Sequence, residues 1–273
     1  MKLYYSTSNS FSIPQLFFQK FPYQEIKLQE NNLLNQKFAQ FPVMLSLENP
    51  LPFSFMVKNV HGNVVVNASQ QIQDADAHII ASVKSEISQL EQRYLAINTA
   101  DCLPIVFYYE DEHHFIGGVT HAGWRGLSLG IISNTIKKLV IEAQLLKLET
   151  QYFLENLKVF LAPAIFGMSY ECGLDVKEAL VQHEASLFIK ESPLRHLFGV
   201  CSDVHNGGVD NKVFPDVQLL GAIECVHVGV VAENISLLRE NTYGHSIFPS
   251  YRESCHKGYK QTKRLWTHLC LPS

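Results

Sequence analysis

The chain has 273 residues, of which 47% are hydrophobic and 18% charged, with a formal net charge of −4. This is the composition of an ordinary globular protein, long enough to bury a core without disulfides or structural metals, as one large domain or two small ones. The negative net charge disfavours nucleic acid as a main partner, because no basic field is present to displace counterions.

The first residues, MKLYYSTSNSFSIPQLFF, hold no uninterrupted apolar stretch with a small-residue cleavage site. We therefore expect no signal peptide and no membrane span, and a cytoplasmic location. In a reducing compartment a cysteine is core, metal ligand or nucleophile rather than half of a disulfide. The chain has six, with no Cys-x-x-Cys pair among them: Cys102, Cys172, Cys201, Cys225, Cys255 and Cys270.

Strand patterns dominate the first half of the chain. Residues 1–50 are punctuated by prolines and predict short strands and loops. Residues 53–67 place two apolar runs around a His-Gly turn, which predicts a hairpin-like or strand–turn–strand unit. Further strands are predicted within 74–82, on both sides of a tight turn in 94–109, and in 114–126, which ends in a Gly-rich turn.

Helical spacing begins after that turn. It predicts a helix over residues 127–146, with one apolar face made of Leu129, Ile132, Ile136, Leu139 and Val140. Four later segments follow: a strand running into a loop (157–167), a helix (175–189), a helical or mixed stretch (210–231) and a terminal segment ending in a strand (246–271). Because helices alternate with closely spaced strands, we expect an α/β protein with a mixed sheet and outer helices.

Three residues that suit metal binding stand at strand ends. His61, Cys102 and His121 each fall where an apolar strand gives way to a turn with Gly or Pro. Such positions often carry chemistry, because a rigid sheet holds the residue and a loop exposes it. Two imidazoles and a thiolate suit Zn²⁺ and leave a fourth coordination position open. The alternative is three unrelated residues, since cysteine is often buried and the spacing matches no short metal motif.

Cys102 also suits nucleophilic catalysis. An imidazole nearby would lower the thiol pKa, whereas the adjacent Asp101 would raise it. A metal-free Cys–His hydrolase or deamidase therefore competes with the metal site, and the sequence does not say which histidine would act as base.

Charged residues in three further loops are candidates for binding and acid–base roles. Arg125 opens the predicted helix and suits an anion site, or is a solvated residue on a glycine-shaped turn. Asp74 and Asp76 suit ligation or proton transfer, but more readily serve as turn and cap residues. Glu171 is a candidate general acid or base, and Arg252 lies in a Pro-bounded loop.

Several segments, taken in order, resemble the YfiH-like family, also called laccase-domain or polyphenol oxidase proteins and interpreted as purine nucleoside phosphorylases. The order TADCLP followed by HAGWRG is highly specific, and the similarity covers roughly residues 55–270. The matching segments are NVHG at 59–62, DADA at 74–77, TADCLP at 99–104, HAGWRG at 121–126, APAIFGMSYECG at 162–173 and SYRE at 250–253.

The resemblance implies a transition-metal site at His61, Cys102 and His121, holding zinc or copper. It implies one domain over residues 1–273, with layered mixed sheets and outer helices as in cysteine-hydrolase-like folds. The implied activity is phosphorolysis of purine nucleosides such as adenosine, inosine and methylthioadenosine, with adenosine deamination alongside. Copper-dependent phenol oxidation fits less well, since blue-copper and trinuclear centres need more His and Met ligands. Some bacterial members are linked to peptidoglycan metabolism.

The chain also departs from the family pattern. The usual N-terminal Arg-Gly-Gly-Val-Ser and Asn-Leu-Gly segments have no match in residues 1–50. Asn59 replaces a glutamine, Cys172 a valine and Asn241 a cysteine, while Asp216 is retained. The metal ligands are thus intact while the periphery differs.

Together these observations predict a cytoplasmic zinc enzyme whose partners are purine nucleosides and phosphate. Cys102 and Glu171 are the predicted catalytic residues, Glu171 as a proton donor to the leaving base. Arg125, with Arg252 second, is predicted to bind phosphate. The alternatives are the metal-free hydrolase and a non-catalytic regulator of peptidoglycan metabolism, and the oligomeric state stays open.

Overall fold

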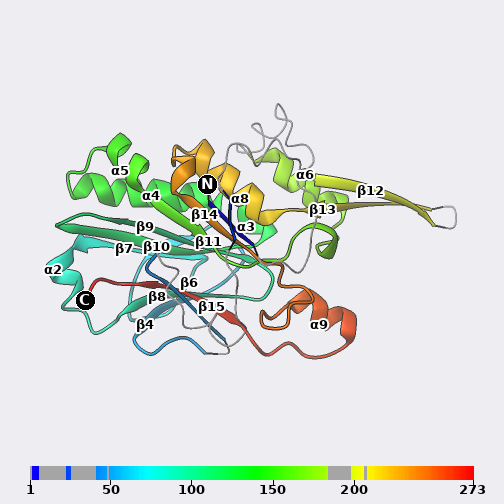
Figure 1. Cartoon of the computed structure of the whole chain (residues 1–273), viewed down its shortest axis with the longest axis horizontal. Helices are drawn as coiled ribbons and strands as arrows, with labels where there is room; N and C mark the ends of the chain where they lie inside the picture. The colour runs from blue at the N-terminus through cyan, green and yellow to red at the C-terminus, as the bar shows by residue number, and fades with distance from the viewer. Residues whose placement is uncertain (1, 6–22, 26–40, 48, 184–197, 206–207) are drawn as a thin grey trace.

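The computed structural model describes residues 2–5, 23–25, 41–47, 49–183, 198–205 and 208–273. Two β-sheets and a group of helices form three layers, with the larger sheet in the middle (Figure 1). Most of residues 1–50, and the end of the helix predicted over 175–189, lie outside the described residues.

The larger sheet has eight strands in the order β2-β1-β14-β11-β9-β10-β7-β5. It is mixed, since β9 and β10 pair antiparallel while β11 and β14 pair parallel, and this confirms the predicted mixed α/β class. The strands are β1 (Lys2–Tyr5), β2 (Tyr23–Glu25), β5 (Val65–Asn67), β7 (Ala77–Val83), β9 (Leu103–Glu110), β10 (His114–Ala122), β11 (Lys158–Leu161) and β14 (Ile235–Arg239).

The second sheet has five strands in the order β3-β15-β8-β4-β6 and covers one face of the larger sheet. Its strands are β3 (Val43–Leu47), β4 (Ser54–Lys58), β6 (Gln73–Asp74), β8 (Tyr94–Thr99) and β15 (Leu265–Cys270). The sheets pack closely at Gly117 of β10, where an added Cβ would clash with the side chain of Leu269 on β15 and with the ring of Phe115. A larger residue there would force these side chains to repack.

Helices cover the opposite face of the larger sheet, with α4 packed on β7 and β10 and α8 packed on β11 and β14. The remaining elements include a hairpin of β12 and β13 that extends away from the layers in Figure 1. The helices are α2 (Lys84–Ile87), α3 (Trp124–Ser128), α4 (Ile131–Leu145), α5 (Thr150–Asn156), α6 (Leu174–Gln182), α8 (Val217–His227) and α9 (Tyr251–Lys257); the hairpin strands are β12 (Phe198–His205) and β13 (Gly208–Pro215), and the short 3₁₀ turns are η2 (Gly167–Ser169) and η4 (Ala232–Asn234).

Strand β9 shows why a strand of the middle sheet is a continuous apolar run in the sequence. Ile105 and Phe107 join the core under the helices, whereas Val106 and Tyr108 join the core between the two sheets. Alternate residues of a strand point to opposite faces, so a strand covered on both sides is apolar throughout. None of the helices in the described part of the chain combines the length and apolar character that crossing a membrane requires.

Two sequence predictions need correction. Of the two alternatives predicted for residues 53–67, the strand–turn–strand unit is confirmed and the hairpin is wrong, because β4 joins the five-stranded sheet and β5 the eight-stranded one. The helix predicted over 127–146 is broken: α3 ends at Ser128 and α4 begins at Ile131. Gly130 between them has a φ of +74°, and Leu129, expected on the buried face, is 55% exposed.

The other predicted elements agree with the structure. Strands β8, β10, β11 and β15 lie within the segments that predicted them, and β7 and β9 each extend one residue beyond theirs, to Val83 and Glu110. The mixed stretch 210–231 resolves into β13 and α8, separated at Asp216, whose side chain accepts a hydrogen bond from the backbone N–H of Leu219 and so caps α8.

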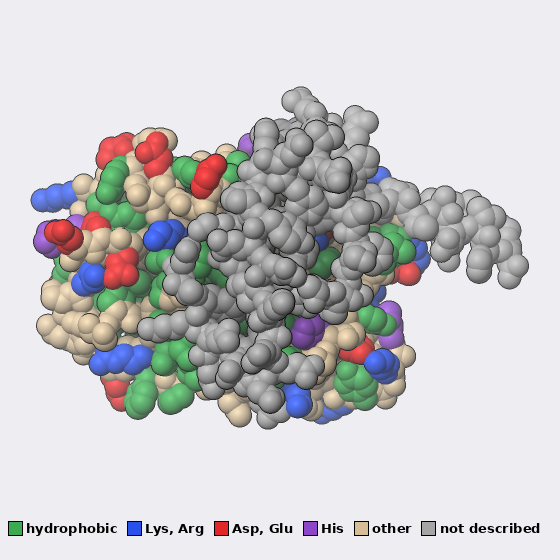
Figure 2. Space-filling model, in the orientation of Figure 1, with side chains coloured by type: hydrophobic (Ala, Val, Ile, Leu, Met, Phe, Trp, Pro, Cys, Tyr) green, Lys and Arg blue, Asp and Glu red, His purple; other side chains and the backbone are tan. Residues whose placement is uncertain are grey.

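On the described part of the face in Figure 2, lysine and arginine side chains are interspersed with acidic ones.

Candidate metal centre

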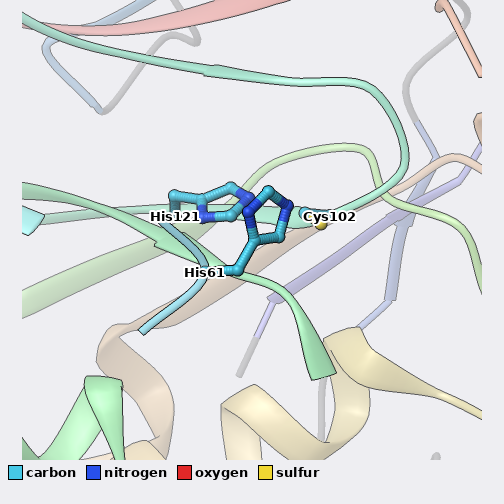
Figure 3. A group of neighbouring side chains, drawn as sticks. All are labelled: His61, Cys102 and His121. Atoms are coloured by element: carbon cyan, nitrogen blue, oxygen red, sulfur yellow. The ribbon is translucent and has the colours of Figure 1, made fainter. Parts of the chain in front are cut away.

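His61, Cys102 and His121 converge, as the sequence predicted. Each offers one ligand atom, and these atoms all lie within 4.8 Å of one another. The two imidazole rings meet edge to face, with centroids 4.7 Å apart (Figure 3). Within the part of the chain that the structure describes, this is the one cluster of His, Cys, Asp or Glu with a geometry suited to a metal.

Strand register explains how such distant residues meet. In the β9–β10 ladder, Pro104 pairs with His121, so Cys102 just before β9 lies beside the end of β10. His61 follows β4 of the other sheet. The centre therefore lies at the ends of β4, β9 and β10, where the two sheets meet. His121 is buried there and His61 is exposed.

One carboxylate holds both histidines. The buried Oδ1 of Asp76 accepts hydrogen bonds from the backbone N–H of His61 at 2.9 Å and from Nδ1 of His121 at 2.9 Å. The backbone N–H of Val60 also donates to Oδ1, and that of Gly62 donates to Oδ2 at 2.6 Å. These bonds fix His61 in a left-handed turn with φ of +59°. Because Nδ1 of His121 is occupied, its Nε2 is the nitrogen free to bind a metal.

The sequence favoured a turn or cap role for Asp76 in its own segment, whereas its carboxylate bonds the backbone of residues 60–62 and the ring of His121. Asp74, its partner in the DADA segment, is exposed and pairs with Lys58 at 3.4 Å. Burial raises the pKa of Asp76, but the hydrogen bonds from His121 and the backbone outweigh it, and the net pKa is lowered. The residue is therefore ionised at neutral pH.

The thiol of Cys102 and the imidazole of His121 form a charged pair. Burial raises the pKa of Cys102, but His121 and His61 outweigh burial and bring it down to about 6. Burial likewise lowers the pKa of His121, but the Cys102 thiolate and Asp76 raise it to about 9. The thiolate form that metals and electrophiles require is thus favoured at neutral pH.

Gly123 leaves the space that the sulfur needs. A Cβ added at this position would lie 3.0 Å from Sγ of Cys102 and 3.6 Å from Cδ2 of His61. Any larger residue here would press on the thiolate. The glycine of the HAGWRG segment therefore serves the site directly, a role that the sequence did not reveal.

A cavity of about 30 Å³ opens beside the cysteine. Two aromatic side chains, Trp124 and Tyr170, face it, together with the apolar Ile165 and Val217. Asp101, Cys102, Ala122 and Gly123 complete its lining. Nucleoside-sized pockets are about 300–1,000 Å³, so this cavity has room for a reacting group rather than for a whole nucleoside.

The two predicted phosphate-binding arginines each contact one of these aromatic walls. The guanidinium carbon of Arg125 lies 4.4 Å from the ring centroid of Trp124, and that of Arg252 lies 5.6 Å from the ring centroid of Tyr170. Arg125 is exposed, whereas Arg252 is half-buried and donates from a terminal guanidinium nitrogen to the carbonyl of Glu171 at 2.7 Å. Both positive charges therefore lie close to the cavity walls.

Glu171 is positioned differently from Tyr170. Its carboxylate is exposed, pairs with Nζ of Lys212 at 3.3 Å and does not line the cavity. The preceding Tyr170 does line it, and burial raises the pKa of this hydroxyl, which therefore stays protonated. The acid–base role of Glu171 stays a prediction, and Tyr170 is a polar group at the cavity that the sequence did not identify.

The donor set fits a divalent transition metal. Atoms bonded to one tetrahedral zinc ion lie roughly 3.3–3.8 Å apart, so the three ligand atoms would have to approach only modestly from their spacing of at most 4.8 Å. A thiolate with two imidazoles suits zinc, and also copper. The carboxylate–histidine contact of Asp76 with His121 is the support that metal-bound imidazoles commonly have.

Comparison with known proteins places this site in a family. The family model described as multi-copper polyphenol oxidoreductase laccase matches residues 36–269, which include all three ligands. The chain belongs to this laccase-like family. The chain is also similar to proteins named purine nucleoside phosphorylase, of which one from Rickettsia prowazekii is 28% identical over 84% of this chain and 83% of its own length. One from Rickettsia conorii is 27% identical over 74% of this chain and 71% of its own.

Other laccase-family relatives agree over shorter stretches or in fold alone. A purine nucleoside phosphorylase from Xylella fastidiosa is 30% identical over 47% of this chain and 45% of its own length. Among solved structures, a Neisseria meningitidis protein is 24% identical, with a TM-score of 0.56 over 81% of this chain and 75% of its own. Bacillus licheniformis YfiH is 17% identical, with a TM-score of 0.57 over 80% of this chain and 74% of its own. These structures confirm the fold.

The pKa of Cys102 predicts a pH profile for its alkylation. In metal-free protein, the rate of reaction with iodoacetamide should rise around pH 6 and be nearly constant above pH 7, because the thiolate forms near 6 instead of 9.0. Timed quenching and mass spectrometry of the Cys102 peptide measure it. In His121→Asn, which lacks the main cause of the lowering, the midpoint should move upward; an unchanged midpoint in this variant would contradict the account.

The hydrogen bonds of Asp76 predict that it supports metal binding. Asp76→Asn places an amide group against N–H donors, and should weaken metal affinity by about 10–100-fold. Competition with a chromogenic chelator measures the affinity. The matched control is Asp74→Asn, two residues away and exposed, which should bind metal as the wild type does. Equal affinities in both variants would rule out the role of Asp76.

Proposed function

We propose that this chain is a metal-dependent purine nucleoside phosphorylase, with zinc as its metal. It would cleave adenosine, inosine or methylthioadenosine with inorganic phosphate, and would deaminate adenosine at the same centre. The convergence of His61, Cys102 and His121 beside a cavity carries this proposal. The names of the relatives, purine nucleoside phosphorylase, supply the reaction class.

His61, Cys102 and His121 would hold the metal, with the cysteine as thiolate. Bound there, zinc would supply Lewis acidity toward a ribose hydroxyl or, in deamination, toward water. In phosphorolysis the bond from the sugar C1′ to the base nitrogen breaks, and a bond from C1′ to a phosphate oxygen forms. The leaving base takes up a proton. The residues around the cavity therefore have to hold an anion, orient the base and deliver that proton.

Arg125 and Arg252 would bind phosphate, because guanidinium groups match its oxygens and these two flank the aromatic walls. Trp124 and Tyr170 would contact the part of the substrate that enters the cavity. The protonated Tyr170 hydroxyl would donate a hydrogen bond to the substrate. Glu171 would deliver the proton to the leaving base, which requires that its side chain leave Lys212 and first take up a proton from the dihydrogen phosphate substrate.

We place the reaction in the cytoplasm. The six cysteines of the sequence form no Cys-x-x-Cys pair and no dense framework, as a reducing compartment favours. Purine nucleosides and phosphate are the proposed partners.

A second candidate is a metal-free thiol hydrolase or deamidase. Cys102, His121 and Asp76 form a chain of contacts in which the thiol pKa is lowered to about 6 and the imidazole is held by a carboxylate. This is the arrangement of a nucleophile, its base and the group that orients the base. Metal analysis of freshly purified protein distinguishes the two, since the hydrolase would hold no metal and would be inactivated stoichiometrically by alkylation.

The proposed activity predicts phosphate-dependent cleavage of adenosine. Metal-loaded protein should release adenine and ribose 1-phosphate with phosphate and neither without it, as followed by chromatography. Cys102→Ala should lose more than about 100-fold of this activity, because a metal ligand is removed. Cys255→Ala, at an exposed cysteine outside the cavity, is the matched control and should be unaffected.

The products separate the hypotheses. Inosine from adenosine indicates deamination. Binding of nucleosides without turnover in metal-loaded protein would contradict the proposal and favour a non-catalytic role.

The two arginines predict a selective effect on phosphate. Arg125→Gln and Arg252→Gln should each raise the KM for phosphate by about 10–100-fold, as expected for a lost charged hydrogen bond. The KM for the nucleoside should stay within about twofold. Arg93→Gln, at an exposed arginine bonded to the carbonyl of Ser88, is the control. If the KM for phosphate is unchanged in both Arg125→Gln and Arg252→Gln, phosphate binds elsewhere.

A further inference from the structure

The backbone just before the cysteine ligand has an unusual conformation. Asp101 has a φ of +95°, whereas the other non-glycine residues with positive φ in the described chain lie between +59° and +65°. The left-handed well is centred near +57°, so only Asp101 lies well outside it. Such a conformation is sparsely populated and persists only where surrounding contacts enforce it.

Three contacts from three separate segments hold Asp101. Its Oδ1 accepts from the hydroxyl of Thr242 at 2.7 Å, and its Oδ2 accepts from the backbone N–H of Arg252 at 2.6 Å. Its carbonyl accepts from the backbone N–H of Ile165 at 2.9 Å. Asp101 is buried, and so is Thr242. Both carboxylate oxygens are thus occupied by protein donors.

Those three segments build the surroundings of the metal centre. Ile165 lines the cavity and leads to Tyr170, which lines it as well. The side chain of Arg252 bonds the carbonyl of Glu171, next to Tyr170. Thr242 is tied back to the Ile165 segment, since its backbone N–H donates to the carbonyl of Ala164. Asp101 therefore connects the cysteine ligand to the cavity wall and to the segment that carries Arg252.

We propose that Asp101 is a positioning residue that fixes the sulfur of Cys102 against the two histidines and sets Arg252 beside the cavity. This role rests on the metal centre of the proposed function, not on the identity of the nucleoside. The left-handed turn at 101 directs the chain from β8 into Cys102, and the three contacts keep that turn in place. Metal binding and phosphate binding then depend on one carboxylate.

Two simpler roles fit less well. Asp101 is not in the group of residues with ligand geometry, and its oxygens already accept hydrogen bonds, so it is not a fourth ligand. Nor is it needed to cap α9, because Ser250 already does so by accepting from the backbone N–H of Glu253 at 3.1 Å.

The test uses Co²⁺ in place of zinc, because a thiolate–cobalt bond gives a charge-transfer absorption band. Asp101→Asn tolerates positive φ but replaces one acceptor oxygen with a donor. It should lower Co²⁺ affinity by about tenfold or more and weaken or shift the band. Thr242→Val, which leaves Asp101 in place and removes one partner, should lower affinity by about three- to tenfold.

Ser250→Ala is the matched control, since it removes the cap of α9 without touching Asp101. It should lower the Tm of the metal-free protein while leaving the Co²⁺ affinity and the band unchanged. Asp101→Asn would show the same pattern if Asp101 only stabilised the fold. If Asp101→Asn and Thr242→Val both bind Co²⁺ as the wild type does, the positioning role is overturned. If the wild type itself shows no thiolate band, the metal centre fails, and this role with it.

Discussion

The structure of the site depends on one buried carboxylate. Removing a charge from water is costly unless hydrogen bonds satisfy it, and Asp76 receives four, from the backbone at Val60, His61 and Gly62 and from the His121 ring. Those bonds offset the desolvation, orient the imidazole of His121 and hold the backbone turn that carries His61. The backbone ladder reinforces this arrangement, since the N–H of His121 donates to the carbonyl of Asp76 at 2.7 Å. The histidine half of the centre is therefore assembled by the fold, before any metal arrives.

The cysteine half is assembled from the other side. β8 and β9 belong to different sheets, so the chain must change direction between them, and Asp101 and Cys102 lie in that turn. The strained backbone there is held by the segments that also carry Tyr170 and Arg252. A site at the junction of two sheets thus draws its ligands and its cavity wall from five separated parts of the sequence. Such an arrangement is rigid where chemistry needs precision.

The sequence predicted most strands, because β8, β9 and β10 carry the apolar patterns of sheet residues, and it predicted the ligands through residue chemistry and family motifs. It could not predict that β4 and β5 join different sheets, since sheet membership depends on distant partners. Position in an apolar strand does not by itself separate functional from structural histidines. His78 and His268 also lie in apolar strands, yet burial lowers the pKa of each to about 4 and both are neutral core residues. The double role of Asp76 likewise appears only once β7 and β10 are paired.

X-ray absorption spectroscopy of the zinc-loaded protein tests the central claim most directly, because it reports the atoms bound to the metal without reference to activity. Shared binding by His61, Cys102 and His121 predicts one sulfur at about 2.3 Å and two imidazole nitrogens at about 2.0–2.1 Å, with a light atom in the remaining position. The sulfur contribution should be absent from Cys102→Ser. A first shell made only of nitrogen and oxygen in the wild-type protein would contradict the account.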